Sequence, residues 1–367
     1  MSNAIEPLEP PRGPAGPEPR SMARVVGLTA VGFAATLILL FGLAGLVRPS
    51  GSGSSRATAT ASAAAPSTPP SPVASGGATP SALPTDPTTS TGQPAGSPSG
   101  PPSGDPVFVG AGDIADCALA DDEATAALVD SIAGTVFTAG DNAYPDGSAA
   151  QFRDCYGPTW GRFLARTRPA PGNHDWVTKD LAGYLGYFGS AAAPDGKSWY
   201  SYDLGTWHIV VLDSDCSSVG GCGADSPQGT WLAGDLQAST ARCTLAIWHQ
   251  PRFSSGKHGN DTEVAPFWTA LAGAGADVVV NGHDHDYERF APQDAAGLLD
   301  RANGLREFVV GTGGAALRTF PTTATNSEVR ATGAHGVITF VLHQGSYEWR
   351  FTSTSGAFSD AGSAACH

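Results

Sequence analysis

The sequence contains a series of side chains that can bind metal ions, each close behind a short apolar run. These residues are Asp113, Asp141 with Tyr144, Asn173 followed by His174 and Asp175, His249, and the pair His283 and His285. A glycine directly precedes several of them, and glycine permits a tight turn at that point. Carboxylate, phenolate, imidazole and amide groups are together ligands for hard and borderline metal ions. The pattern therefore predicts a metal site formed by several loops.

Single members of this set carry little information. A Gly-Asp pair after a strand is usually a turn, so Asp113 or Asp141 alone would have an ordinary structural interpretation. A lone histidine is more often a hydrogen-bonded structural residue than a ligand. His283 and His285 are a stronger signal, because two histidines at this spacing can reach neighbouring metals from one turn of backbone. The whole set, in this order, favours a metal centre.

The segments that must position these residues have the length and composition of β-strands. Runs of β-branched and aromatic residues occupy Val107–Val109, Thr135–Thr138, His208–Leu212, Leu245–Trp248, Asp277–Val280 and Phe308–Val310. Asp121–Ile132 and Glu263–Ala272 are predicted helices, and Val337–Leu342 with Tyr347–Phe351 predicts a terminal hairpin. This alternation predicts an α/β fold or a layered α+β sandwich. In open sheets, loops at the carboxyl ends of strands converge on one crevice, which is where the candidate ligands fall.

The composition divides the chain into four parts. Residues 1–24 form a predicted short cytoplasmic N-terminal segment, and residues 25–47 carry no charge over a length that spans a bilayer. Residues 48–105 are rich in Ser, Pro, Ala and Thr and contain too few large apolar residues to fold, which predicts a disordered linker. Residues 106–367 form the predicted catalytic domain and are long enough for a substantial core.

The apolar run 25–47 predicts a membrane anchor, with a cleaved signal peptide as the alternative. Arg48 and Pro49 follow the run where a signal peptide would have a small-x-small cleavage site, so a retained anchor is favoured. We therefore expect a single-pass protein of the cell membrane with its catalytic domain outside the cell. If the N-terminal segment is cleaved, the protein is secreted.

Charge and cysteine content limit the partners and the compartment. The chain has 20 Lys and Arg against 34 Asp and Glu, a net charge of −14, which argues against nucleic acid as a specific partner. All six cysteines lie in residues 106–367 and include no C-x-x-C pair. An even, scattered set of this kind predicts disulfides in an oxidising compartment. Cys216 and Cys222 are close enough to close a small loop, while Cys117 with Cys155 and Cys243 with Cys366 are two candidates among the 15 pairings that six cysteines allow.

The motifs resemble those of the calcineurin-like metallophosphoesterases and, within them, the purple acid phosphatases. The resemblance rests on five blocks, Gly112–Asp113, Gly140–Tyr144, Gly172–Asp175, Trp248–Pro251 and Gly282–Arg289. Tyr144, three residues after Asp141, separates the purple acid phosphatases from most relatives. The resemblance implies a four-layer α/β/β/α sandwich of two mixed sheets.

It further implies a binuclear metal centre bridged by Asp141. One metal, Fe(III) in the family, would bind Asp113, Tyr144 and His285, and the other, Fe(II), Zn or Mn, would bind Asn173, His249 and His283. Phenolate and carboxylate are hard donors suited to a trivalent ion, whereas imidazole and an amide oxygen suit a borderline divalent one. The chemistry of the donor groups therefore agrees with this division of the ligands between a trivalent and a divalent ion.

The reaction that the resemblance implies is hydrolysis of phosphomonoesters by attack of a metal-bound hydroxide. Asp141 and His174 would be catalytic, with His174 protonating the leaving group, and His258 matches a substrate-facing histidine of the family. Arg252 is a candidate to bind a phosphate oxygen. The alternative for His258 is an ordinary exposed histidine, and for Arg252 a surface salt bridge. Asp175 is expected to orient ligands from behind.

Two other functions remain open. A phosphodiesterase or nucleotidase would use the same metal centre with different pocket walls, which no residue of the sequence specifies. A surface module that binds a metal or ligand without turnover is the second alternative, although no ligand position is substituted in this chain. In each enzymatic case the partner is a phosphorylated small molecule. Asp116, beside Asp113, is expected to accept a hydrogen bond that orients a ligand rather than to be one.

Overall fold

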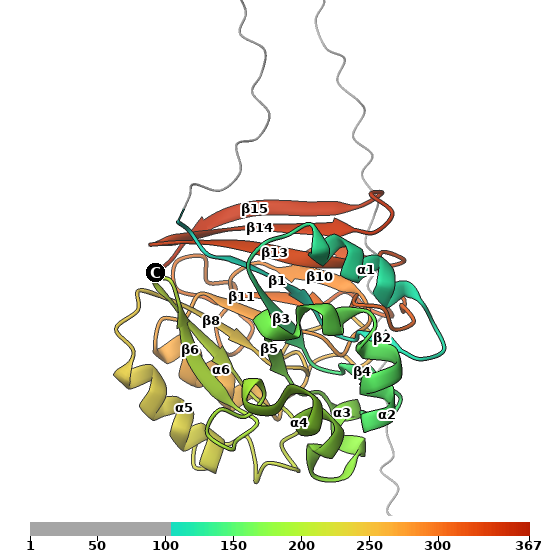
Figure 1. Ribbon diagram of the computed structural model, residues 1–367. Coiled ribbons are helices and arrows are strands. Elements are labelled where there is room, and N and C mark those ends of the chain that lie inside the picture. The colour runs from blue at the N-terminus through green and yellow to red at the C-terminus, as the bar shows by residue number, and fades with distance from the viewer. Residues whose placement is uncertain (1–103) are drawn as a thin grey trace, which may run out of the picture. The chain divides into compact units, whose positions relative to one another are not determined.

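Residues 104–367 are described by the computed structural model, and they build two mixed β-sheets that face each other (Figure 1). The first sheet has the order β15 (Ser359–Ala365), β14 (Ser346–Ser353), β13 (Gly336–His343), β1 (Val107–Ala111), β3 (Thr135–Ala139) and β5 (Thr167–Ala170). The second has the order β12 (Ser327–Ala331), β10 (Tyr287–Phe290), β11 (Arg306–Val310), β9 (Val278–Asn281), β8 (Cys243–Ile247), β7 (Trp207–Val211) and β6 (Tyr200–Leu204). A third, two-stranded piece pairs β2 (Ala115–Asp116) with β4 (Ala143–Tyr144).

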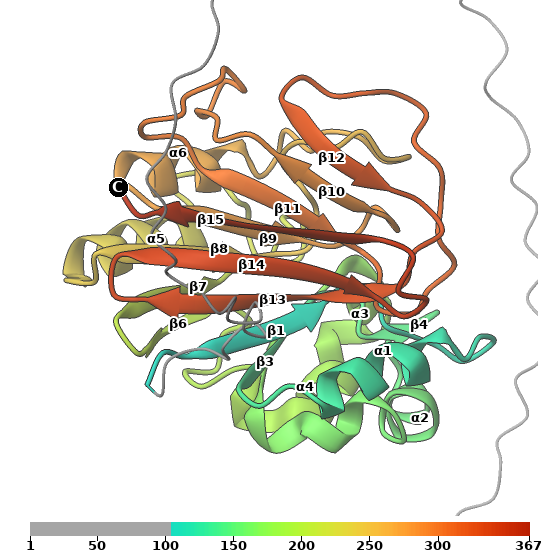
Figure 2. The ribbon, with the colours of Figure 1, turned by 90° about the horizontal axis from the view of Figure 1, so that it is seen from above.

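Helices lie on the outer side of each sheet (Figure 2). They are α1 (Asp121–Asp130), α2 (Ala149–Gln151), α3 (Asn173–Val177), α4 (Ala182–Phe188), α5 (Pro227–Ala238) and α6 (Ala265–Gly273). A π-helix, Phe152–Tyr156, and 3₁₀ turns at Trp160–Arg166, Lys179–Leu181 and Gly189–Ala191 complete the helical segments of the described part. The helix α1 packs on the first sheet through Ala126 and Val129, whereas α5 and α6 pack on the second. The predicted two-sheet sandwich is confirmed.

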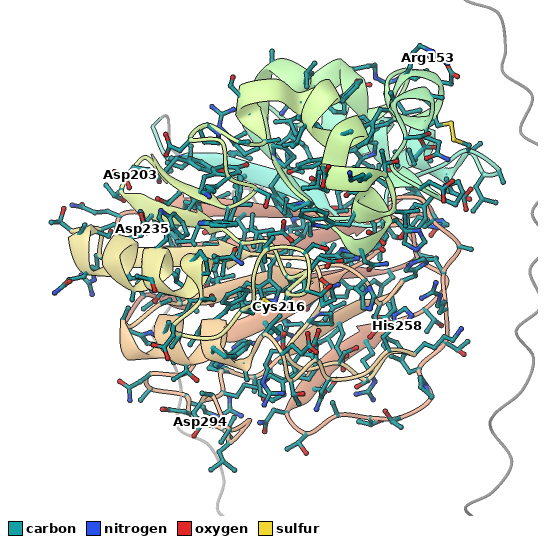
Figure 3. All side chains as sticks on the ribbon, turned by 90° about the horizontal axis from the view of Figure 1, so that it is seen from below. Arg153, Asp203, Cys216, Asp235, His258 and Asp294 are labelled. Carbon is teal, nitrogen blue, oxygen red and sulfur yellow. A yellow bond between two sulfur atoms is a disulfide. The ribbon has the colours of Figure 1, made fainter. Side chains whose placement is uncertain are left out.

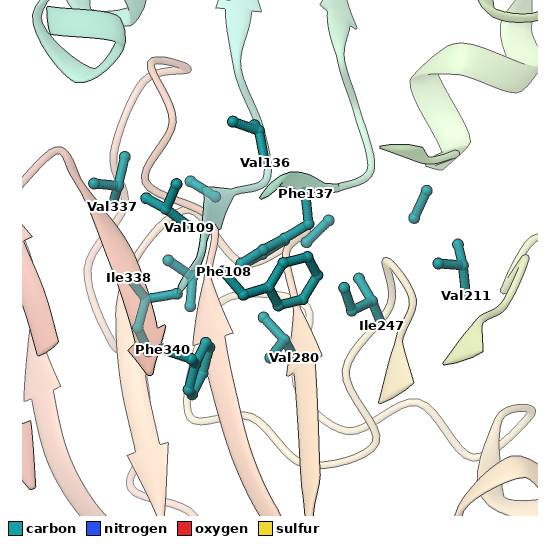
Figure 4. Close-up of a cluster of buried hydrophobic side chains, with 14 of the residues drawn as sticks. Phe108, Val109, Val136, Phe137, Val211, Ile247, Val280, Val337, Ile338 and Phe340 are labelled. Atoms are coloured by element: carbon teal, nitrogen blue, oxygen red, sulfur yellow. The ribbon is translucent and has the colours of Figure 1, made fainter. Parts of the chain in front are cut away.

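The two faces of the second sheet enter two different cores, because successive side chains of a strand point to opposite faces. In β9, Val278 and Val280 enter the core between the sheets, while Val279 packs under α5 and α6. The core between the sheets includes Phe108 and Phe137, whose ring centroids are 4.6 Å apart (Figure 4). A strand buried on both faces must be apolar throughout, which is why these strands stand out as continuous apolar runs in the sequence.

The candidate ligands follow the parallel strands, which form one side of the first sheet, with β5 at its edge, and the interior of the second sheet. β1 pairs in parallel with β3 and β3 with β5, while β7, β8, β9 and β11 pair in parallel in the second sheet. Parallel neighbours end at the same edge, so the segments that follow these strands meet there. The fold thus brings together residues that are far apart in the sequence.

The C-terminal end corrects one expectation. The predicted hairpin is present as β13 and β14, but it is not terminal, because β15 pairs with β14 along its whole length. Small residues fill β15, and sequence propensity gives little indication of such a strand. Its position depends on packing instead. A Cβ atom at Gly362 would lie 2.3 Å from the indole of Trp349, so the ring lies directly against the β15 backbone.

The expected disulfides are present. Cys117 pairs with Cys155, Cys216 with Cys222, and Cys243 with Cys366. The last bond ties the start of β8 to the chain end beyond β15 and so links the two sheets. The predicted N-terminal segment 1–24, span 25–47 and nearly all of the linker 48–105 lie outside the described residues. Within residues 104–367, no helix is long and apolar enough to cross a bilayer.

Candidate metal centre

The predicted ligands meet where the parallel strands end. Asp113 follows β1, Asp141 follows β3, Tyr144 ends β4, Asn173 begins α3 after β5, His249 follows β8, and His283 and His285 follow β9. Both sheets therefore contribute to one site. The contacts below connect six of these residues directly, and Asn173 adjoins them through the backbone of His174.

Asp113, Tyr144 and His285 form one half of the site. The Tyr144 hydroxyl donates to Asp113 Oδ1 at 2.6 Å and lies 3.2 Å from His285 Nε2. His285 Nε2 is in turn 3.2 Å from Asp113 Oδ1. These three side chains are the set expected for a trivalent ion, and they converge on one point.

Asp141, His249 and His283 form the other half, and their ligand atoms lie within 4.8 Å of one another. His249 Nε2 is 3.1 Å from Asp141 Oδ2 and 3.3 Å from His283 Nδ1. The same Asp141 Oδ2 lies 2.9 Å from the Tyr144 hydroxyl. One carboxylate oxygen therefore touches both halves, as a bridging ligand must.

Asn173 provides an independent indication that a cation belongs here. Its side-chain oxygen Oδ1 is buried and has no hydrogen-bond partner among the described residues. A buried amide oxygen without a donor costs about 1–3 kcal/mol. The next residue, His174, donates its backbone N–H to Asp141 Oδ1 at 2.8 Å, which places Asn173 beside the bridging carboxylate. A bound metal ion would supply the partner that Asn173 Oδ1 lacks. The seven donor side chains therefore fit a pair of metal ions.

Two of the histidines have one ring nitrogen committed to the backbone. His249 Nδ1 lies 2.8 Å from the carbonyl oxygen of Ala139, and His285 Nδ1 lies 2.8 Å from that of Ala316. A carbonyl oxygen can only accept, so Nδ1 carries the hydrogen in both rings. When these rings are neutral, they present the Nε2 lone pair to the site, which is the form that binds metal.

The backbone at three ligand positions adopts a conformation that side chains disfavour. Asp113, Asp141 and His283 have φ values of 58°, 51° and 70°, in the left-handed region. Such a residue costs of order 1–3 kcal/mol and is found mainly at functional sites. Close packing surrounds these turns as well, because a Cβ at Gly172 would lie 2.2 Å from Asp141 Oδ1.

Electrostatic coupling is strong within this buried cluster. Burial opposes ionisation of Asp113, but His285 and His249 outweigh it and hold the pKa of Asp113 well below its usual value. Burial lowers the pKa of His249, but Asp141 outweighs this effect and raises it to about 10. Burial, followed by the charges of Asp113 and Asp141, raises the pKa of Tyr144 well above its usual value. A bound cation would lower the pKa of Tyr144, because coordination favours the phenolate.

Asp175 braces the site from behind, as expected. Its carboxylate accepts from the backbone N–H of Gly172 at 2.9 Å and from the side chain of Asn142 at 2.9 Å. It therefore ties the turn after β5 to the turn after β3. Asp116, by contrast, accepts from the backbone N–H of Ala118 in its own turn rather than from a ligand.

The expected catalytic and substrate-binding residues lie in different surroundings. His174 Nδ1 lies 2.6 Å from the carbonyl of Pro145, and Nε2 lies 3.9 Å from Asp141 Oδ2. The ring of His258, labelled in Figure 3, stacks on that of His283 with centroids 4.1 Å apart. Both histidines therefore border the ligand cluster. The guanidinium of Arg252 lies over the Phe253 ring, 4.4 Å from its centroid, and its role toward substrate stays a prediction.

Other residues of the site were not identified from the sequence. The Ser214 hydroxyl oxygen accepts from the backbone N–H of His249 at 3.2 Å, and Glu307 Oε1 accepts from that of Arg252 at 3.0 Å. Both fix the loop that carries His249. Asp284 and Arg318 contact His258. Asp284 stands between the two histidine ligands in the sequence, whereas Ser214, Glu307 and Arg318 lie outside every motif.

Comparison with known proteins agrees with this geometry. The family model described as calcineurin-like phosphoesterase matches residues 105–287. Purple acid phosphatase 21 of Arabidopsis thaliana is 30% identical over 165 residues, covering 38% of this chain and 37% of that protein. Purple acid phosphatase 15 of the same plant is 30% identical over 149 residues, covering 35% and 27%. The chain thus spans little more than a third of the length of the first curated relative.

A solved structure supports the fold. The purple acid phosphatase PPD1 from yellow lupin (Lupinus luteus) seeds matches with a TM-score of 0.56 at 19% identity, covering 72% of this chain and 54% of that one. The matched family region includes Asp113, Asp141, Tyr144, Asn173, His249, His283 and His285, the cluster described above. The chain belongs to the calcineurin-like phosphoesterases and is of the purple acid phosphatase type.

Proposed function

We propose that the protein hydrolyses phosphomonoesters at a binuclear metal centre. The single observation that supports this most directly is the convergence of seven donor residues, with the buried Oδ1 of Asn173 unpartnered at their edge. Family membership supports a phosphorylated small molecule as substrate. No ligand position is substituted, which favours turnover over the alternative of a binding module that has lost its chemistry.

Two bound cations would polarise the phosphoryl oxygens and lower the pKa of a water molecule so that it can attack phosphorus. The chain's own residues would hold these cations in two sets that share Asp141. Asp113, Tyr144 and His285 form the set of harder donors, and Asn173, His249 and His283 form the softer set. The carboxylates and the phenolate offset most of the metal charge, so an acidic protein can still bind an anion.

His174 is positioned to protonate the leaving group. Its Nδ1–H donates to the Pro145 carbonyl, which leaves Nε2 facing the side of the site where Asp141 lies. The ring also packs on Tyr144, with centroids 4.4 Å apart, and is one-third exposed. An imidazole fixed in this way can donate a proton to an alkoxide oxygen leaving phosphorus.

The identity of the metals is part of the proposal. We propose Fe(III) in the set with Tyr144 and Fe(II), Zn or Mn in the other, because phenolate and carboxylate favour the harder ion. A phenolate on Fe(III) would give a visible charge-transfer band. Replacing Tyr144→Phe should abolish that band in the iron-loaded protein. An unchanged band would refute the iron assignment even with the fold intact.

The cellular location is also a proposal. Three disulfides support an oxidising compartment, because such bonds rarely persist in the cytosol. The apolar run 25–47 would anchor the catalytic domain at the outer face of the cell membrane, or direct its secretion if cleaved. Cell fractionation of the tagged full chain tests this, and recovery in the cytosol with reduced cysteines would contradict it.

Phosphate release from p-nitrophenyl phosphate by the metal-loaded full chain tests the function. We expect turnover that a chelator removes and that added metal restores. The same assay with bis(p-nitrophenyl) phosphate distinguishes a monoesterase from a diesterase. Preference for the bis ester would support the phosphodiesterase alternative, and no turnover of either compound by protein with bound metal would support the binding module.

A further inference from the structure

Asp213 and Ser214 lie just past the carboxyl end of β7, next to the segment that follows β8 and carries His249. The parallel pairing of these two strands continues beyond β7, because the Leu212 backbone N–H donates to the Ile247 carbonyl at 2.8 Å. Both residues are buried, and neither is a candidate metal ligand. They lie outside every sequence motif of the site. Their contacts nevertheless reach the segments that carry two of the three residues of the softer ligand set.

Ser214 holds the backbone at His249. Its hydroxyl oxygen accepts from the His249 backbone N–H at 3.2 Å and from that of Gln250 at 3.0 Å. The same hydroxyl donates to the side-chain oxygen of Gln250. Three hydrogen bonds thus fix the backbone from which the His249 ring projects into the site. A displacement of Ser214 would therefore move this ring relative to the other ligands.

Asp213 holds the helix α3, which begins at the ligand Asn173. The Trp176 indole N–H donates to its carboxylate, with the two oxygens 3.2 Å and 3.1 Å from the indole nitrogen. Trp176 is three residues after Asn173 in a helix of only five residues, so the two positions lie on one side of a single turn. The bond to the Trp176 ring therefore limits how far Asn173 can shift.

The segment that contains Asp213 is itself fixed to α5. Gln228, in the first turn of that helix, accepts from the Asp213 backbone N–H at 2.8 Å and donates to the Asp213 carbonyl oxygen at 2.8 Å. The Ser198 hydroxyl and the Asp215 backbone N–H donate to the carboxylate, at 2.5 Å and 3.0 Å. Gln228 and Asp213 are fully buried, so solvent does not compete for these bonds. The link between the two ligand-bearing segments is therefore rigid.

The helix α3 has two such anchors, and each relates it to a different part of the site. Asp175 ties the start of the helix to the turn after β3, which carries the bridging Asp141. The Trp176 bond ties the helix to the segment after β7 and so to His249. The first anchor thus positions Asn173 relative to the residue that both metals share. The second positions it relative to another ligand of the same metal.

Asp213 is also a buried carboxyl group that the proposed reaction does not use. Burial raises the pKa of Asp213 to about 7, although hydrogen bonds from Ser198, Asp215 and Trp176 act in the opposite direction. Near neutral pH the group is therefore present in both forms, and either form offers an oxygen that can accept the indole N–H. The bond to Trp176 thus does not depend on the charge of Asp213.

We propose that Asp213 and Ser214 are positioning residues that hold Asn173 and His249 at the separation required by one divalent cation. They then determine the affinity for the ion in the softer ligand set without binding it. This inference rests on the proposed function and assigns roles at the same site to residues that no motif indicates. No hydrogen bond within residues 104–367 joins Asp213 or Ser214 to a residue of the harder set, so binding of the other cation should change much less.

Titration of the zinc-loaded full chain with a chelator, with the released zinc measured by a metal indicator, tests the proposal without relying on turnover. Replacing Asp213→Ala should weaken the binding of one of the two zinc ions about 10- to 100-fold and that of the other by less than about threefold, because the Trp176 N–H loses its acceptor. Ser214→Ala should weaken binding of the same ion. Asp213→Asn keeps an oxygen that can accept from the indole and should recover most of the affinity.

A double-mutant cycle with Asn173 separates positioning from a general loss of stability. If Asp213 acts through Asn173, adding Asp213→Ala to the Asn173→Ala variant should change zinc binding by less than about threefold further. The matched control is Asp235→Ala, because Asp235 accepts from the Ser201 hydroxyl at the opposite ends of the strands and should leave both zinc ions unaffected. Circular dichroism and thermal melting check that each variant is folded.

Equal weakening of both zinc ions by Asp213→Ala would overturn the proposal, because the effect would then reflect the fold. Additive losses in the double variant, or a loss in Asp213→Asn as large as in Asp213→Ala, would contradict a role through Trp176 and Asn173. If the unchanged chain binds two zinc ions and the Asp213→Ala variant binds both as tightly, the proposed function stands and only this inference fails. If the unchanged chain binds no zinc, the proposed function fails and the inference fails with it.

Discussion

Two regions of the domain place a buried histidine against aspartate, and only one of them fits a metal. In the first, His208 on β7 contacts Asp203 and Asp235 near the start of the parallel strands. In the second, His249 lies against Asp141 at the opposite ends of those strands. Figure 3 shows Asp203 and Asp235 at one side of the domain and His258 of the metal centre at the other.

His208 and His249 differ in the contacts of their Nε2 atoms. Both nitrogens of His208 are committed to carboxylates, Nδ1 at 3.2 Å from Asp203 and Nε2 at 2.8 Å from Asp235. In His249 only Nδ1 is bonded to a backbone carbonyl, that of Ala139. Its Nε2 faces two other candidate metal ligands, Asp141 and His283. Burial beside an aspartate therefore does not identify a ligand. A metal ligand is indicated instead by a histidine that has one ring nitrogen bonded to a backbone carbonyl and the other directed at a cluster of metal-binding side chains.

The largest expected effect is a loss of activity on changing the bridging residue. Asp141→Asn should lower kcat for p-nitrophenyl phosphate by about 10³-fold or more, because an amide cannot bridge two cations. The matched control is Asp235→Asn, which alters the aspartate of the His208 cluster and should retain kcat within about twofold. Full turnover in the Asp141 variant, with its metal content measured, would remove the basis for the site.

An intermediate effect is expected at Asn173. Asn173→Ala removes the buried Oδ1 and should weaken binding of one metal about 10- to 100-fold, with activity recovering at high metal concentration. Titration with Zn or Mn followed by activity measures this. If the variant reaches full activity without additional metal, Asn173 Oδ1 is not a metal ligand.

The smallest effect concerns stability and pH in the His208 cluster. Burial lowers the pKa of His208, but the hydrogen bonds to Asp235 and Asp203 outweigh it and raise the pKa above its usual value. A raised pKa stabilises the fold below about pH 6.5, the usual histidine value, and this contribution is lost as pH rises through the raised value. Asp235→Asn should therefore lower the free energy of unfolding by about 1–3 kcal/mol at acidic pH and by less above neutrality.

Denaturant titrations at several pH values measure this difference. Asp203→Asn is the control, because the Asp203 side chain is 75% exposed and that of Asp235 only 16%, so solvent screens the first pair. A difference between the unchanged chain and the Asp235 variant that grows with rising pH would contradict the assignment.

The sequence predicted most of the residues that the structure brings together, because each candidate ligand lies in a local motif. Gly-Asp after an apolar strand and the pair His283 and His285 are visible without a structure, and the parallel sheets bring them to one edge. Arg318 and Glu307 could not be found in this way. Their roles arise from contacts with residues 60 and 55 positions away, and neither lies in a pattern that indicates chemistry.

The fold was predicted less completely than the site. The two apolar runs that form β8 and β9 are buried on both faces and are obvious in the sequence. The edge strand β15 and the helix α5 were missed. β15 consists of small residues that are placed by Trp349, and α5 contains two glycines that lower its helix propensity. A start signal for α5 was present, since Ser226 caps it and Pro227 occupies its first turn.

The central claim is that the seven donor residues bind two cations. Elemental analysis of the folded full chain, prepared with iron and zinc present, tests it most directly. We expect about two transition-metal ions per chain, and fewer in the Asp141→Asn variant than in Asp235→Asn. A folded chain that retains no stoichiometric metal under these conditions would contradict the account.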